Sequence, residues 1–372
     1  MLEKTRSLFR FIFILINIGI ILLYLSVCLV PFINTGKFWF FAFPGLAFPI
    51  IFFALFCFMV LWLILRSKWF WVCLVVMLLG FQQIRAVFAF HFPQNFSDVK
   101  APNTLRVFHW NVKGWDNSFD KKKAGEKSDK PKMFDLIKEQ NPDVLCFEEY
   151  SDLKDINDPK SNTSAIMKIG YPYFVFAPTE KKPDRTQQGV IIFSKFPIID
   201  SATISYGEDT QAEHLIYADI KCGEKTFRIF TTHLQSVRFE HSDYRSLDRL
   251  KHAHDPGYSD SRTIAAKLRT GYVHRYRQAQ IVKQKIEESP YPVIITGDFN
   301  DVPNSNTYFT IKGKLQDAFL KKGTFIGRTF RFISPTLRID FIFADKSFKV
   351  NQFRIKHVSY SDHYPLETDL QW

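Results

Sequence analysis

The sequence predicts an α/β fold in which two packed β-sheets are flanked by helices and preceded by a membrane-spanning helical region. Three observations predict it. The first ninety residues consist mostly of long apolar runs. From residue 105 onward, short apolar runs of strand length alternate with helical stretches. Many of these strands end in polar loops and helices are few, which is typical of two sheets packed face to face with helices outside.

Three apolar runs occupy the N-terminal part, at residues 8–30, 38–65 and 69–90. A bilayer core requires about 20 apolar residues per helix, which the first two runs provide. The third run crosses Gln82, Gln83 and Arg85, so the alternatives are three spans or two spans plus an interfacial segment. We predict three. A signal peptide is the competing interpretation of the first run, but no small-residue cleavage pattern follows Val30.

Basic residues beside these runs predict the orientation. Lys4, Arg6 and Arg10 precede the first run, and Arg66 and Lys68 separate the second from the third. Short loops rich in Lys and Arg stay in the cytoplasm. Three spans would therefore place the rest of the chain on the periplasmic or luminal side of a multi-pass membrane protein. If the third run does not cross, the orientation is reversed.

We expect residues 1–90 to form a membrane anchor of about three transmembrane helices, residues 91–104 a linker, and residues 105–372 a catalytic domain. The linker carries two prolines and a polar mixture of residues, which is typical of a connection. Within the domain, strands are expected at 105–110, 144–148, 190–193, 214–220, 226–232, 293–296, 339–343 and 366–370, and helices near 132–140, 161–169 and 275–288.

The charge of the chain does not by itself indicate nucleic-acid binding. The formal net charge is +12, but residues 1–100 hold eight basic and two acidic residues, so half of that charge belongs to the anchor and linker. The remaining positive charge is mild for a domain of this size. The segment 237–276 is rich in Lys, Arg and His and directly follows His233. It is either a substrate or membrane contact over the site or a solvated helical addition.

Polar side chains stand where predicted strands meet loops. Asp298 and Asn300 follow the apolar run at 293–295, and Asp362 and His363 lie in a loop before the last strand. Strands that end this way deliver side chains into a cleft. Carboxylates, an amide and an imidazole at such positions suit a divalent cation and an in-line attack on phosphorus. The other residues placed in this way are Asn111, Glu149, His233 and Asp340.

In chain order, the blocks WN, PDVLCFEE, TTHL, GDFN, RIDFI and SDHYP resemble the endonuclease/exonuclease/phosphatase family. That family includes DNase I, apurinic endonucleases, inositol-phosphate phosphatases and neutral sphingomyelinases. The resemblance extends from Leu105 to the C-terminus, and six blocks in the family's order make it specific. It implies a four-layer α/β sandwich of two mixed sheets, and metal-dependent hydrolysis of phosphoric ester bonds.

The resemblance implies Mg²⁺ as the cofactor, with Mn²⁺ as the alternative. Glu149 would be the direct metal ligand, and Asp362 the second acidic contact. Asn111 would assist the metal or bind phosphate. Apurinic endonucleases carry an Asp two residues after this Asn, whereas this chain has Lys113. That departure weakens an abasic-site substrate but not hydrolysis itself.

The resemblance also implies the catalytic residues. His363 is the strongest candidate, with Asp340 holding and polarising its imidazole. Asp298 would orient the attacking water or the metal, and Asn300 would donate to the developing phosphorane charge. His233 would stabilise the phosphoryl group or supply a proton to the leaving oxygen. The sequence leaves open which histidine is the acid and which is the base.

The expected partners are a phosphate-ester substrate, either nucleic acid or a phospholipid head group, and the lipid bilayer. The basic segment 237–276 could provide a groove for several phosphates. The anchor would instead hold the site close to lipid. No segment indicates an obligate protein partner. The alternative function is a non-catalytic, membrane-tethered binding module that retains the fold, but such a module would be expected to have lost at least one of these site residues.

Overall fold

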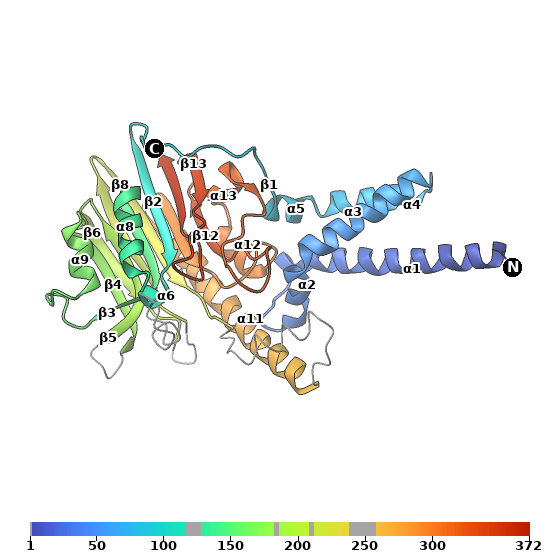
Figure 1. Cartoon of the computed structure of the whole chain (residues 1–372), viewed down its shortest axis with the longest axis horizontal. Coiled ribbons are helices and arrows are strands. Elements are labelled where there is room, and N and C mark those ends of the chain that lie inside the picture. Colours follow the sequence, from blue (N-terminus) through green and yellow to red (C-terminus); the bar gives the residue numbers. More distant parts are fainter. Residues whose placement is uncertain (1, 117–127, 182–185, 208–211, 238–257) are drawn as a thin grey trace.

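The computed structural model of the protein describes residues 2–116, 128–181, 186–207, 212–237 and 258–372. Figure 1 shows two parts. Helices α1 (Leu2–Leu29), α3 (Phe48–Ile64) and α4 (Trp69–Leu79) project together from one side of an α/β domain. The N-terminus lies at the far tip of this projection, and the C-terminus lies within the domain.

Two six-stranded sheets form the centre of the domain. Both are mixed, because β2 pairs with β3 and β8 pairs with β9 in parallel while the other pairs are antiparallel. The first sheet has the order β13 (Lys349–Ile355), β14 (Leu366–Gln371), β2 (Thr104–Asn111), β3 (Val144–Leu153), β5 (Thr186–Ser194) and β4 (Tyr173–Lys181). The second has the order β10 (Gln316–Asp317), β12 (Asp340–Ala344), β9 (Val293–Asp298), β8 (Lys225–His233), β7 (Leu215–Cys222) and β6 (Ile198–Ile204).

Each sheet is covered on both faces, so its central strands β2, β8 and β9 are buried along almost their whole length. Val107, Val190 and Ile229 belong to the core between the sheets. Helices α8 (Lys130–Gln140) and α9 (Asn162–Lys168) cover the outer face of the first sheet, and α11 (Tyr258–Glu287) and α12 (Asn306–Lys312) cover the second. The predicted four-layer α/β sandwich is confirmed.

The structure differs from the sequence prediction at sheet edges and in one helix. The edge strands β4, β6 and β13 are absent from the prediction; the residues of β6 are largely exposed, so it lacks a buried apolar run. The helix expected to begin at residue 275 begins at Tyr258. The latter part of the segment 237–276 is therefore continuous with that helix, and its residues 238–257 lie outside the described part of the chain.

The three predicted spans differ in regularity. Leu8–Phe32 forms a single helix that is long enough and apolar enough to cross a membrane. The second and third runs are bent by 63° and 62°, so each is a broken span or a re-entrant loop. The second bend lies at Gly80, between α4 and α5 (Phe81–Val87). A side chain at Gly80 would collide with the ring of Tyr24, so glycine lets α1 and α4 approach closely.

The N-terminal helices, residues 2–87, are packed directly against the domain; they are called the anchor below, after the prediction from the sequence. The amide of Asn306, at the start of α12, donates to the carbonyls of Pro31 and Ile33, at 3.3 and 3.1 Å. A Cβ on Gly45, in α2 (Phe43–Leu46), would collide with the carbonyl oxygen of Asn304. The two parts therefore meet at a close backbone contact, and residues 91–104, predicted to be a linker, are not their sole connection.

Gly45→Val is expected to destabilise the full-length protein by about 1–3 kcal/mol, because the added side chain overpacks this contact. The matched control is Gly19→Val in α1, where an added Cβ meets no atom within 4 Å. Thermal unfolding of both variants in the same detergent would measure the difference. An unchanged Tm for Gly45→Val would show that the anchor does not pack on the domain as described.

Candidate active site

The predicted site residues are brought to one end of the two sheets by strand register. His233, the last residue of β8, lies opposite Asp298, the last residue of β9. Asp340, the first residue of β12, lies opposite Asp298 on its other side. From the first sheet, Asn111 ends β2 and its amide donates to Asp298 Oδ2 at 3.1 Å. The ends of both sheets thus meet at Asp298.

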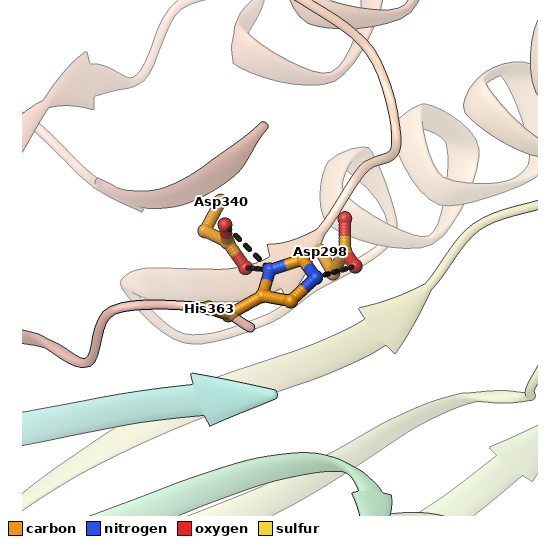
Figure 2. A group of neighbouring side chains, drawn as sticks. All are labelled: Asp298, Asp340 and His363. Atoms are coloured by element: carbon orange, nitrogen blue, oxygen red, sulfur yellow. Dashed lines mark hydrogen bonds and ion pairs between the residues drawn. The ribbon is translucent and has the colours of Figure 1, made fainter. Parts of the chain in front are cut away.

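His363 lies between two aspartates (Figure 2). Its Nδ1 is 3.0 Å from both carboxylate oxygens of Asp340, and its Nε2 is 3.6 Å from Asp298 Oδ2. Burial disfavours the charged imidazole, but the two carboxylates outweigh it and raise the pKa of His363 well above its ordinary value. Asp340 contacts His363 as the sequence predicts.

His233 has a second, parallel arrangement. Its Nδ1 is 3.1 Å from Glu213 Oε2, and its Nε2 is 3.6 Å from the same oxygen of Asp298 that His363 faces. Burial opposes charge on this ring too, but Glu213 and Asp298 raise the pKa of His233 to about 10. Two imidazoles, each held at Nδ1 by its own carboxylate, therefore present Nε2 to one aspartate oxygen.

Glu213 is a site residue that the sequence pattern does not indicate. It precedes β7 instead of following a strand, so it lacks the pattern that marks the other site residues. Its Oε2 also accepts the backbone N–H of Glu149 at 3.0 Å. Glu213 therefore connects His233 to the residue predicted to bind the metal.

Asp298 is almost fully buried. Burial, together with the nearby charge of Asp340, raises its pKa to about 6 despite the opposing charges of His363 and His233. Its other oxygen accepts the backbone N–H of Asn300 at 2.9 Å. The side-chain amide of Asn300 donates to the carbonyl of Leu234, so it is held beside the site by the His233 strand. Asn300 adopts a left-handed backbone with φ 51°.

The sequence predicts that Glu149 ends its strand, but β3 continues to Leu153. Glu149 lies at a bulge within β3, where the register shifts between Phe147 and Tyr150, and its φ is 48°. Bulges redirect a side chain, and non-glycine residues with positive φ cluster at functional sites. Glu149 Oε1 accepts the amide of Asn111 at 3.1 Å, so the bulge turns this carboxylate toward the other site residues.

Asp362 faces a cation already present in the chain. Its Oδ2 is 2.7 Å from the ammonium of Lys113. Burial alone would raise the pKa of Asp362, but His363 and Lys113 hold it below its ordinary value. The carboxylate is therefore ionised at neutral pH, and Lys113 is its cationic partner in this structure. Lys113 and the following residues Gly114 and Trp115 all have positive φ, a strained turn for the two non-glycine residues.

The donor types of the residues predicted to bind a metal suit a divalent cation. Hard oxygen donors are what Mg²⁺ prefers, and Glu149, Asp362 and Asn111 offer two carboxylates and an amide. In the part of the chain that the structure describes, one group of three acidic or imidazole residues has its ligand atoms within 4.8 Å of one another: Asp298, Asp340 and His363. Asp340 and His363 already satisfy each other by hydrogen bonds, so this group is a poorer cation site than the oxygen donors.

A further buried pair lies behind Asp340. His109 Nε2 is 3.3 Å from Asp340 Oδ1, and its Nδ1 is 3.3 Å from Glu148 Oε1. Burial alone would lower the pKa of His109, but the carboxylates of Glu148 and Asp340 outweigh it and raise that pKa to about 9. Glu148 also accepts a hydrogen bond from the Thr231 hydroxyl at 2.6 Å. A histidine in the mostly apolar run 105–110 is the signal in the sequence that could have indicated this contact.

The model of the endonuclease/exonuclease/phosphatase family matches residues 109–363, and the chain belongs to this family. Members of the family are phosphoester hydrolases and are generally metal-dependent. A second model, for a domain of unknown function, matches residues 10–87, within the anchor. No curated protein matches the sequence.

Solved structures share the fold. An endonuclease/exonuclease/phosphatase family protein from Bacteroides thetaiotaomicron is 20% identical with a TM-score of 0.52, covering 73% of this chain and 98% of that one. One from Beutenbergia cavernae is 19% identical with a TM-score of 0.51, covering 72% of each chain. The human nocturnin catalytic domain with bound sulfate is 18% identical with a TM-score of 0.50, and the match covers 73% of this chain and 96% of that one. At these identities the likeness concerns the fold alone.

Proposed function

We propose that this protein is a membrane-anchored, Mg²⁺-dependent phosphodiesterase, with Mn²⁺ as an alternative ion. One observation carries the proposal: His363 and His233 both direct Nε2 at the buried carboxylate of Asp298 while separate carboxylates hold their Nδ1 atoms. Such an arrangement provides two proton donors, each with its Nε2 3.6 Å from one shared proton acceptor.

The protonation states suggest the roles. Asp298 has a pKa of about 6, so it suits accepting a proton from the attacking water. The raised pKa values keep His363 and His233 protonated, so one ring can stabilise the phosphorane charge while the other protonates the leaving oxygen. A cation held by Glu149, Asp362 and Asn111 would polarise the phosphoryl oxygens. Asn300 would donate to the developing charge after release from Leu234.

The docked anchor favours a phospholipid head group as the substrate over nucleic acid. The loop after Asp298 continues to Asp301, whose carboxylate accepts from Thr307 at 2.8 Å. The adjacent Asn306 contacts the anchor carbonyls of Pro31 and Ile33. A few residues therefore separate the reacting groups from the segment that follows α1, and such a site would lie close to the bilayer surface.

Hydrolysis assays on the full-length protein with Mg²⁺ would test this function. Phosphatidylcholine, sphingomyelin, duplex DNA, single-stranded RNA and inositol phosphates form the substrate panel. Phosphodiester cleavage that Asp298→Asn abolishes is expected, with lipid as the best substrate. Cleavage of DNA alone would overturn the lipid assignment, and absence of hydrolysis of any phosphate ester would favour the binding module.

We also propose that three spans place residues 105–372 on the periplasmic or luminal side. The turn between α3 and α4, which carries Arg66 and Lys68, lies at the end of the helices remote from the domain, as does the start of α1 (Figure 1). Basic segments grouped at one end support a cytoplasmic location for that end.

Protease added to cells with a permeabilised outer envelope tests this orientation. Digestion of the domain without rupture of the inner membrane is expected. The tag for detection belongs at the C-terminus, which lies in the domain. Digestion that occurs only after the inner membrane is broken would reverse the orientation and show that the third run does not cross.

His109→Leu is expected to lower kcat by about 10- to 100-fold with little change in KM, since a buried hydrogen-bond partner of Asp340 is lost. His109→Gln is the matched variant, because a glutamine amide can place a donor near the position of Nε2. It should retain most of the turnover. Steady-state kinetics of both variants would measure the split. Equal kcat for His109→Leu and the wild type would show that this contact does not orient the Asp340–His363 pair.

A further inference from the structure

Exposed aromatic side chains gather where the anchor meets the domain. Phe90, Phe92 and Phe325 are 75%, 88% and 55% exposed. They belong to the two-stranded sheet of β1 (Ala89–Phe90) and β11 (Thr324–Phe325) and the residues beside it, and Figure 1 shows β1 between α5 and α13 (Ala318–Lys322). Phe325 continues an aromatic row into the anchor, with ring centroids 5.6 Å from Phe88 and 6.4 Å from Phe53.

Basic side chains surround the same place. Lys321 is at the end of α13, and His91 reaches the adjacent carbonyl of Leu320 at 3.2 Å. The segments that carry Lys312, Lys346 and Arg85 are held together by hydrogen bonds: Gln316 donates to the carbonyl of Asp345 at 3.0 Å, and Arg338 donates to Asp317 at 2.8 Å and to the carbonyl of Ala86 at 2.7 Å. Burial, together with the charges of Lys346, Lys321 and Arg85, lowers the pKa of Lys312 against the attraction of Asp317. Arg85, Lys321 and Lys346 are exposed.

This concentration of like charge is unfavourable by itself. Asp317, the acidic residue that attracts Lys312, is already in an ion pair with Arg338 at 2.8 Å. Within the described parts of the chain, none of the four basic side chains forms an ion pair with a carboxylate. A cluster of like charges of this kind attracts anions from outside the protein. We call Phe90, Phe92 and Phe325 together with Arg85, Lys312, Lys321 and Lys346 the junction surface.

We propose that the junction surface lies in the head-group region of the bilayer, where its lysines and arginine bind anionic phospholipids and its phenylalanines enter the interface. The proposal rests on the proposed membrane anchor, and it adds a second, lipid-specific contact that fixes how the domain is oriented. Exposed aromatic residues beside cations are the combination that membrane interfaces favour.

The position of the surface favours lipid over nucleic acid. The aromatic row is continuous with the anchor through Phe53 of α3 and Phe88, so the bilayer that surrounds α3 would reach it first. Phenylalanines that are more than half exposed also offer apolar area that a phosphate backbone does not use. A DNA-binding surface requires basic side chains, but it does not require exposed phenylalanines beside them.

Cysteine accessibility in nanodiscs tests the contact. Phe92→Cys and Phe325→Cys would be compared with Val99→Cys. Val99 is 82% exposed, and it lies near Ser97, which is hydrogen-bonded to Gln352 of β13. A charged, membrane-impermeant maleimide is added to full-length protein in discs of phosphatidylcholine with or without phosphatidylglycerol. The wild type, with its native cysteines, gives the background. Labelling at positions 92 and 325 is expected to be at least about tenfold slower than labelling at position 99 when phosphatidylglycerol is present.

The charge contribution is tested by Lys312→Gln, Lys321→Gln and Lys346→Gln combined in the Phe92→Cys background. Their matched control replaces Lys138, Lys168 and Lys225 by glutamine, which are exposed and lie elsewhere on the domain. The first triple variant should lose the protection that phosphatidylglycerol adds, and the second should keep it.

Three outcomes would overturn the proposal. Position 92 labelled as fast as position 99 in both lipids would show that the surface is free of the membrane. Protection that is independent of phosphatidylglycerol would remove the anionic-lipid contact. Protection produced by short duplex DNA in phosphatidylcholine discs would assign the surface to nucleic acid. Carbonate-resistant flotation of the same variants with vesicles tests the anchor separately, so its failure cannot be mistaken for failure of the junction surface.

Discussion

His363→Ala is expected to lower kcat for phosphoester hydrolysis by about 10²–10⁴-fold, the usual contribution of a positioned acid or base. The ring is held by two 3.0 Å contacts with Asp340 and faces Asp298, so its removal deletes a proton donor at the centre of the site. Asp298→Ala should have an effect of similar size, because both imidazoles then lose the carboxylate that they share. Pre-steady-state and steady-state turnover on the best substrate would measure both effects.

The control is His357→Ala, which removes a neighbouring imidazole whose ring packs 4.6 Å from Tyr364 without contacting the site carboxylates named above. Its turnover should stay within a few-fold of the wild type. Circular dichroism and thermal unfolding establish that each variant is folded. Near-native kcat in a folded His363→Ala protein would remove this histidine from the mechanism, and the same result for Asp298→Ala would remove the aspartate.

The predicted site residues follow from patterns that are local in the chain. Asn111, His233 and Asp298 each follow a short apolar run in the sequence. This pattern predicts their positions correctly because the strands that carry them end at the same end of the two packed sheets. The position of Glu149 in the chain is predictable in the same way, but its geometry is not. The bulge in β3 arises from pairing with β5, and no local pattern records it.

The positioning groups are harder to predict because they act across the fold. Glu213 reaches His233 from the start of a neighbouring strand, 20 residues away in the sequence. His109 meets Asp340 across 231 residues of sequence and across the interface between the sheets. Neither residue has a distinctive neighbour in the chain. Contacts of this kind follow from packing, and only the assembled core brings them together.

Burial decides which strands can be predicted from the sequence. Central strands such as β9 are buried on both faces and have continuous apolar runs in their sequence. Edge strands such as β6 face solvent on much of their surface, so their sequence lacks that signal. The bends in the anchor depend on contacts between helices, such as Gly80 against Tyr24, which composition and length do not reveal.

Removing divalent metal is expected to abolish hydrolysis, and Mg²⁺ or Mn²⁺ should restore it. Glu149 and Asp362 are half-buried carboxylates whose present partners include the amide of Asn111 and the ammonium of Lys113. A carboxylate in a partly desolvated place is stabilised in its charged form by a nearby cation. We therefore expect Glu149→Gln and Asp362→Asn to raise the Mg²⁺ concentration for half-maximal activity by at least about tenfold, the lower limit for disturbing a metal site.

Metal binding should also be visible without turnover. A ligand that binds the folded protein stabilises it, by about 2.7 kcal/mol at a concentration one hundred times its Kd, so the Tm of the wild type should rise with Mg²⁺. Glu149→Gln should show little rise, whereas Glu139→Gln, a matched change at a largely exposed glutamate on α8, should behave as the wild type. Dialysis against excess chelator followed by assay, with and without added Mg²⁺, completes the test. Full activity in the chelated protein, together with a Tm that does not respond to Mg²⁺, would show that Glu149 and Asp362 do not hold a cation and that the hydrolysis proceeds through the imidazoles and Asp298 alone.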